Sequence, residues 1–280
     1  MPNGFEVVKP RTRAEALELL AGPQAAPLVT APRPDPLWGT PVHTFVDLGA
    51  LDLDYIRAEA DGCLHVGAAT SLQRLVDDIP LAAGTNGLLE RAALQAAPEI
   101  LRNLACLWGA LRAHDGSPEL LLALLALEAQ VVMLEAKKKP RNLGLPEYLA
   151  SRTGNKNALL IEVRFAPLPA VGWALERVAR TPRDEAIVAA AAVVEAKDGH
   201  VDRVRLALAG ANPQPVRLET VEQNLAGKAP DEKNLQAAAE AAASQARPVS
   251  DFRGSAEYRR AMVPVVVRRA LQDAWKRAAG

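Results

Sequence analysis

The sequence predicts an α+β fold arranged as two successive domains. Two Asp-Gly pairs, Asp61-Gly62 and Asp198-Gly199, each lie between apolar runs and indicate β-hairpins. Helical patterns separate these hairpins, so strands and helices are mixed along the chain. The proline-rich segment Ala166-Pro167-Leu168-Pro169 is a candidate linker. The 280 residues suit two domains, because a domain typically has ~100–200 residues.

The first part of the chain contains helix and strand signals on either side of a proline-rich loop. Arg13–Leu20 reads as a helix, with Thr12 as its N-cap and Glu15 at the capping-box position. Thr44–Leu48 reads as a strand. Between them, prolines exclude regular structure and predict a loop that contains Pro32, Pro34, Pro36 and Pro41.

The next segment predicts a hairpin followed by helices. Residues 56–60 and 64–67 flank Asp61-Gly62, a turn whose two residues we expect to have positive φ. Residues 71–78 and 87–97 are helix candidates. Ser117-Pro118-Glu119 combines an N-cap, a proline in the first turn and an acid at the positive helix end, and the helix that follows is apolar on all sides, which predicts burial.

The remaining elements follow the same reasoning. Strands are expected at residues 131–134, 159–165, 187–196 and 201–209, and helices at 235–246 and 255–277. In the strand at 201–209, Val204, Leu206 and Leu208 alternate with Arg203, Arg205 and Ala207, which predicts one buried face. The expected inner stripe of the last helix is Tyr258, Met262, Val265 and Val266, with Arg259-Arg260 and Arg268-Arg269 on its surface or against a partner.

Composition excludes several classes of function. Lys plus Arg and Asp plus Glu each number 33, so no footprint for nucleic acid appears. Two distant cysteines, Cys63 and Cys106, are too few for a zinc or iron–sulfur site, and the histidines show no ligand spacing, so no metal is expected. The most apolar run, residues 120–127, is far shorter than the ~20 residues of a membrane span. With no visible signal peptide, we expect a soluble, cytoplasmic protein that contacts neither membrane nor nucleic acid.

Several segments, in one order, carry a resemblance to a known family. They are Phe45-Val46-Asp47-Leu48, Leu64-His65-Val66-Gly67-Ala68-Ala69-Thr70-Ser71-Leu72, Arg102-Asn103-Leu104-Ala105, and, most strongly, residues 250–262 (SDFRGSAEYRRAM) followed by Arg268-Arg269-Ala270-Leu271. The chain resembles the FAD-binding medium subunit of the molybdopterin hydroxylases, the family of xanthine dehydrogenase and aerobic CO dehydrogenase.

This resemblance implies a fold, a cofactor and partners. The implied fold is a PCMH-type FAD-binding domain over residues 1–168, with lobes of about 1–55 and 56–168, and then a C-terminal domain of the CO dehydrogenase flavoprotein type over residues 173–280. The implied cofactor is FAD, which receives electrons from molybdenum through iron–sulfur clusters. The implied partners are an iron–sulfur subunit and a molybdopterin subunit.

Both flavin loops depart from the family pattern. The first normally reads P-L-x-A-G-G-T, whereas here Pro27-Leu28-Val29 is followed by Thr30, Ala31, Pro32 and Arg33. The second normally reads T-I-G-G-N, whereas here it reads Cys106, Leu107, Trp108, Gly109 and Ala110; the acid that follows is Glu119. Glycines allow backbone N–H groups to approach a pyrophosphate, while proline has no N–H to donate. We therefore expect FAD binding to be weak or absent.

Three functions remain open from the sequence. The first is a flavin-free medium subunit that acts as a scaffold or assembly partner, with Trp108 filling the vacated space. The second is a functional electron-transfer subunit that holds FAD through an altered loop. The third, from another class, is a standalone small-molecule binding protein, although no catalytic residue set stands at a readable spacing.

Overall fold

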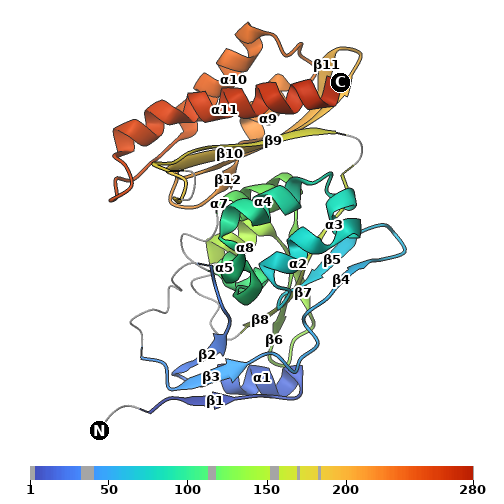
Figure 1. Ribbon diagram of the computed structural model, residues 1–280, viewed down its shortest axis with the longest axis vertical. Coiled ribbons are helices and arrows are strands. Elements are labelled where there is room, and N and C mark those ends of the chain that lie inside the picture. Colours follow the sequence, from blue (N-terminus) through green and yellow to red (C-terminus); the bar gives the residue numbers. More distant parts are fainter. Residues whose placement is uncertain are drawn as a thin grey trace. The chain divides into compact units, whose positions relative to one another are not determined.

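The computed structural model describes residues 4–32, 41–112, 118–151, 158–168, 171–181 and 184–279 (Figure 1). The chain forms two compact units, each built from separate stretches of sequence. The first unit comprises Met1–Leu81, Ala97–Ser117 and Glu128–Pro167, and the second comprises Ala82–Ala96, Pro118–Leu127 and Leu168–Gly280. Because no single cut separates the units, the domain boundaries at 168 and 173 stay a prediction.

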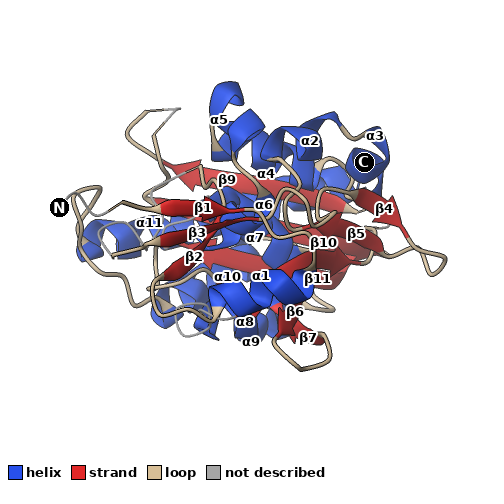
Figure 2. Ribbon diagram, turned by 90° about the horizontal axis from the view of Figure 1, so that it is seen from below, coloured by secondary structure: helices blue, strands red, loops and turns tan. Residues whose placement is uncertain are grey.

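A small parallel sheet with a covering helix begins the first unit. Its strand order is β1-β3-β2, and Figure 2 shows these strands side by side. Helix α1 contacts β2 and β3, and the hydroxyl of Thr12 accepts a hydrogen bond from Glu15 N, as the sequence predicted. The bounds are β1 Glu6–Val8, α1 Arg13–Leu20, β2 Ala25–Leu28 and β3 Thr44–Asp47.

A five-stranded antiparallel sheet forms the rest of the first unit's strand structure. Its order is β4-β5-β8-β6-β7. The predicted hairpin at 56–67 is present, but only Gly62 has positive φ; Asp61 instead accepts a hydrogen bond from Cys63 N in a longer turn. The bounds are β4 Ile56–Ala58, β5 Leu64–Gly67, β6 Gln130–Glu135, β7 Arg141–Gly144 and β8 Ala158–Phe165.

Short helices surround this sheet. Ser71 caps α2, whose Leu72 and Leu75 are buried. The residues of the expected second flavin loop are not a loop, because Leu107 to Arg112 form α6. The helices α3, α5, α6 and α8 were not predicted. The bounds are α2 Leu72–Asp77, α3 Ile79–Gly84, α5 Glu99–Leu104, α6 Leu107–Arg112 and α8 Leu145–Ser151.

A four-stranded antiparallel sheet is the centre of the second unit. Its order is β12-β11-β10-β9. The predicted hairpin is correct here, and both turn residues, Asp198 and Gly199, have positive φ. The bounds are β9 Gly172–Val178, β10 Val188–Lys197, β11 His200–Ala209 and β12 Val216–Arg217.

Helices cover both faces of this sheet. Helix α11 packs on β9 and β10, and α7 contacts β10 and β11, with α4 against β9 (Figure 1). The prediction of a single buried face was therefore wrong: Arg205 is buried as well and pairs with Glu195 at 2.8 Å. The bounds are α4 Leu88–Ala96, α7 Pro118–Ala126, α9 Glu219–Leu225, α10 Glu232–Gln245 and α11 Ala256–Ala279.

Helix α11 lies close to the sheet because Gly172 leaves room for it. A Cβ at Gly172 would overlap the carbonyl oxygen of Ala274. The predicted inner stripe was right for Val266, which is 1% exposed, but wrong for Tyr258, which is 39% exposed. The buried residues of the helix are Arg259, Val263, Val266, Val267, Ala270, Leu271 and Ala274.

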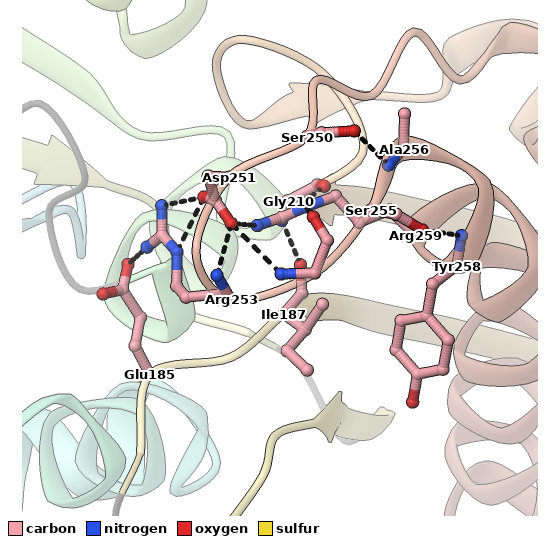
Figure 3. Close-up of polar contacts among 11 residues, drawn as sticks. Glu185, Ile187, Gly210, Ser250, Asp251, Arg253, Ser255, Ala256, Tyr258 and Arg259 are labelled. Atoms are coloured by element: carbon pink, nitrogen blue, oxygen red, sulfur yellow. Dashed lines mark hydrogen bonds and ion pairs between the residues drawn. The ribbon is translucent and has the colours of Figure 1, made fainter.

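Arg259 was expected on the surface, but it is 4% exposed and forms the centre of a polar cluster (Figure 3). Its guanidinium donates to the carbonyl oxygens of Ile187 and Gly210 and to Asp251 Oδ1 at 2.6 Å. Asp251 also accepts from the Arg253 side chain at 2.6 and 2.8 Å, and Arg253 pairs with Glu185. The segment with the strongest sequence match therefore has a structural role: its side chains connect the loop before α11 to the ends of β10 and β11.

We predict that Asp251→Asn destabilises the second unit by about 3 kcal/mol, because it leaves the buried guanidinium of Arg259 without its anion. Asp273→Asn changes a partly exposed carboxylate of α11 that pairs with Lys276; it is the matched control and should change the unfolding free energy by less than about 0.5 kcal/mol. Chemical denaturation of both variants measures the difference.

The same variant has a pH signature. Burial raises the pKa of Asp251, but hydrogen bonds from Arg253 and Arg259 outweigh it and hold that pKa well below its ordinary value. The stabilisation is thus fully present above the unfolded pKa of about 4 and is lost as pH falls below it. If Asp251→Asn lost stability between pH 6 and pH 3 as steeply as the parent chain, this role of Asp251 would be excluded.

Candidate functional site

The two segments that correspond to the family's flavin loops meet in the first unit. Thr30, Ala31 and Pro32 follow the end of β2, and Cys106 to Ala110 run from an isolated bridge with Ser71 into α6. The amide of Cys106 donates to the carbonyl oxygen of Thr30 at 2.9 Å, which joins the segments directly. Arg33 lies outside the described residues.

Gly109 is the point of closest approach between the segments. A Cβ at this position would overlap the carbonyl oxygen of Thr30 and lie 2.9 Å from the amide nitrogen of Ala31. Since both are backbone atoms, they cannot move aside as a flexible side chain would. The glycine is therefore required by packing within the chain.

Every backbone N–H from Cys106 to Ala110 already has an acceptor in the chain. Leu107 N donates to Thr70 O and Trp108 N to Ala68 O, each at 2.9 Å. Gly109 N faces Cys106 Sγ at 3.5 Å, and Ala110 N donates to Cys106 O at 3.0 Å. With the Cys106 amide on Thr30, these five donors are engaged.

The first segment keeps two backbone donors. Among the described residues, the amides of Thr30 and Ala31 have no hydrogen-bond acceptor, and Pro32 has no N–H. The Ala31 amide nitrogen also lies 2.9 Å from the place that a Cβ on Gly109 would occupy. The first segment therefore offers at most two neighbouring N–H groups to an anion.

The side chains of the second segment form a packed, uncharged layer. Leu107, Trp108 and Ala110 are buried, with Trp108 4% exposed. Burial raises the pKa of the Cys106 thiol, so that side chain is neutral at physiological pH. No described side chain at positions 30–32 or 106–110 carries a positive charge that would meet a phosphate.

Glu119 belongs to the second unit, where it lies in the first turn of α7. Its side chain is fully buried, and Oε1 lies 3.3 Å from Nε of Arg177 on β9. Arg177 also donates to the carbonyl oxygen of Asp184. From the sequence, Glu119 was expected both at a helix start and, by the resemblance, at a flavin-loop position. Arg177 was not identified, because nothing in the spacing of residues 119 and 177 indicates that α7 packs on this sheet.

Other site types find no support in the described parts of the chain. These residues contain no group of three or more His, Cys, Asp or Glu side chains that could hold a metal ion. Cys63 and Cys106 are free thiols. None of the described helices is long and apolar enough to cross a membrane.

Family comparisons decide the assignment. Residues 3–168 match the family model of the FAD binding domain in molybdopterin dehydrogenase. Residues 173–274 match that of the CO dehydrogenase flavoprotein C-terminal domain. The chain belongs to the FAD-binding medium-subunit family of the molybdopterin dehydrogenases. The predicted family and α+β fold class are thus confirmed.

Individual relatives agree along the whole chain. It is 31% identical to the carbon monoxide dehydrogenase medium chain of Hydrogenophaga pseudoflava, with 100% of both chains covered. It is 25% identical to the glyceraldehyde dehydrogenase medium chain of Sulfolobus acidocaldarius, over 97% of this chain and 99% of the relative. The solved Hydrogenophaga pseudoflava carbon monoxide dehydrogenase superposes with a TM-score of 0.89 at 29% identity, covering 99% of each chain.

We predict that Gly109→Ala destabilises the first unit by about 1–3 kcal/mol, because the added methyl group forces the Thr30 backbone away and strains the contact. Gly144→Ala is the control, since a Cβ there would make only an ordinary contact with Pro146 at 3.8 Å. Urea unfolding of the two variants tests this. A Gly109→Ala chain as stable as the control would show that the two segments are not held together here.

Proposed function

We propose that this chain is a flavin-free medium subunit of a molybdenum hydroxylase-type oxidoreductase complex, in which it acts as a scaffold or assembly subunit. The observation that carries the proposal is the engagement of all five backbone N–H groups from Cys106 to Ala110 within the chain. A pyrophosphate carries charges that backbone donors must meet at close range. The second segment has no such donor to spare.

The first segment adds to this argument. The family pattern places two glycines where this chain has Ala31 and Pro32, and Pro34, outside the described residues, removes a further N–H. Hydrogen bonds to charged groups contribute ~1.5–3 kcal/mol each, so two lost donors cost roughly 3–6 kcal/mol. Since 1.4 kcal/mol is tenfold in affinity, FAD binding would weaken by at least about a hundredfold.

The residues kept from the family pattern have roles that need no cofactor. Gly109 is required by the Thr30 backbone, and Glu119 is paired with Arg177. The buried indole of Trp108 supplies apolar packing where the family pattern has a glycine. Their presence therefore supports a retained scaffold as well as it would support a cofactor site.

A functional FAD subunit is the second candidate, favoured by the family itself and by the two available amides of Thr30 and Ala31. Arg33 would contribute a guanidinium, which binds phosphate through charge-assisted hydrogen bonds. In that case, bound FAD would accept electrons from iron–sulfur clusters and pass them to an acceptor. This chain's part would be to position the pyrophosphate with those two amides.

The partners proposed for the chain are an iron–sulfur subunit and a molybdopterin subunit. The support is that relatives are named as medium chains or as subunits of complexes, such as the 6-hydroxypseudooxynicotine dehydrogenase complex of Paenarthrobacter nicotinovorans. A chain that matches the whole Hydrogenophaga pseudoflava medium chain can keep its contacts with such partners while its loops change.

We predict that the purified chain retains no flavin and binds added FAD with a Kd above about 1 μM, since the lost donors remove two or more tenfold steps in affinity. Flavin fluorescence quenching during titration measures this. The variant Ala31→Gly/Pro32→Gly restores the two family glycines and should bind FAD at least about tenfold more tightly.

The control for that variant is Pro41→Gly, which removes a proline that lies outside the segment in contact with Gly109. It should leave FAD affinity unchanged. Flavin retained through purification, or a sub-micromolar Kd for the unmodified chain, would favour the second candidate and end the flavin-free proposal.

We also predict that tagged chain expressed in its native host co-purifies with two other proteins. One should carry iron–sulfur clusters, visible by absorbance, and the other should carry molybdenum, visible by metal analysis. An untagged host preparation is the control. Recovery of neither protein at physiological salt would remove the assembly role.

A further inference from the structure

The first unit contains a cleft of about 560 Å³, and none of the residues that line it belongs to the two flavin-loop segments. Three arginines from three different elements line it: Arg13 begins α1, Arg57 lies in β4 and Arg164 in β8. Ligand pockets commonly have volumes of ~300–1,000 Å³, so this cleft is large enough for a small organic molecule.

A buried carboxylate holds two of the three arginines in place. Glu162 is 2% exposed; its Oε1 pairs with Arg164, and its Oε2 lies 3.7 Å from Arg57 Nη2. His65 Nδ1 lies 3.1 Å from Oε1, and the hydroxyl of Tyr55 donates to Oε2. Burial, followed by the bond to Glu162, raises the pKa of Tyr55 to about 12, so this hydroxyl stays a donor at neutral pH.

One arginine of the cleft takes no part in this network. Among the described residues, Arg13 has no ion-pair partner, although it is exposed and lines the same cleft. Arg57 pairs with Glu59 at 3.1 Å, yet its side chain remains 54% exposed and its guanidinium lies 4.8 Å from the centre of the Tyr55 ring. Arg13 and Arg57 are therefore cations of the lining that a ligand can reach.

The lining also contains apolar side chains. Val132, Leu134 and Ile161 come from β6 and β8, and Pro140 lies between β6 and β7. Val132 and Ile161 are buried, so the accessible apolar surface of the lining comes from Leu134 and Pro140. Cationic side chains beside accessible apolar ones are complementary to a molecule with an anionic head and an apolar body.

We propose that this cleft binds a small organic anion, with a carboxylate or phosphate held by Arg13 and Arg57 and an apolar body against Leu134 and Pro140. Glu162 and Tyr55 are positioning residues that orient the guanidinium groups. This site does not rest on the proposed flavin-free function, because none of its residues belongs to the flavin-loop segments.

The test is calorimetric titration of the full chain with phenyl phosphate and with benzoate. Benzyl alcohol is the neutral control, and inorganic phosphate is the control without an apolar body. We expect at least one aromatic anion to bind more tightly than both controls. Phenyl phosphate alone would identify a dianionic head group, and benzoate binding would extend the site to carboxylates.

Arg13→Ala and Arg57→Ala should each weaken that binding about threefold to tenfold, and the double variant at least about tenfold, because charge-assisted bonds at an exposed rim are partly screened. Arg268→Ala removes an equally charged, partly exposed arginine that pairs with Glu232 in the second unit, and should have no effect. Circular dichroism confirms that each variant is folded, and Arg13→Gln provides a second substitution with a longer side chain.

Two results would overturn the proposal. One is the absence of binding by either aromatic anion at millimolar concentration. The other is binding that Arg13→Ala, Arg57→Ala and the double variant leave unchanged, or that benzyl alcohol matches.

Discussion

The contact between the Thr30 carbonyl group and Gly109 is the constraint on which the arrangement of the candidate site depends. It joins the segment after β2, in the parallel sheet, to α6, which lies between β5 and β6 of the antiparallel sheet in the chain. The hydrogen bond from Cys106 N to Thr30 O also holds these two segments together. With these segments closed on each other, the amides of α6 find acceptors in the chain and the indole of Trp108 is buried. The hydrogen bonds of the α6 amides and the burial of Trp108 thus both follow from the close approach of Thr30 to Gly109.

The second unit depends on a different device, the insertion of a charged side chain between strands. Helices on both faces leave the ends of β10 and β11 covered, so the carbonyl groups of Ile187 and Gly210 need internal donors. Arg259 supplies both bonds from the first turns of α11, and Asp251 supplies the anion that makes its burial acceptable. This explains why the segment SDFRGSAEYR carries the strongest resemblance: its polar residues specify how the last helix begins relative to the sheet.

The sequence predicted those elements whose signal is local. The Asp198-Gly199 hairpin and the capped start of α1 follow from turn and capping chemistry, and the burial of α7 follows from its uniformly apolar composition. Arg259 and Arg205 were misplaced because an arginine on a helix or a strand is ordinarily exposed; the carbonyl groups and the carboxylate that hold them are distant in sequence. The same reason hid the cleft around Glu162, whose arginines come from α1, β4 and β8. For the candidate site, the positions and residue types could be read from the resemblance, but the bonds that engage the amides of residues 106–110 could not.

The fold can be kept while the flavin-loop residues change, because contacts inside the chain and contacts with a pyrophosphate constrain different residues. Gly109 is needed by a backbone contact inside the chain, and Glu119 by its ion pair, so both persist whether or not a pyrophosphate is present. The positions that a phosphate alone would constrain are those where glycine serves only to admit the ligand, and there this chain has Ala31, Pro32 and Trp108. A proline costs nothing at a loop position whose N–H has no acceptor in the fold, whereas it is costly where that N–H must bind a ligand. The positions of Ala31, Pro32 and Trp108 therefore depart from the glycines of the family pattern, whereas Gly109, which a backbone contact inside the chain requires, keeps its glycine.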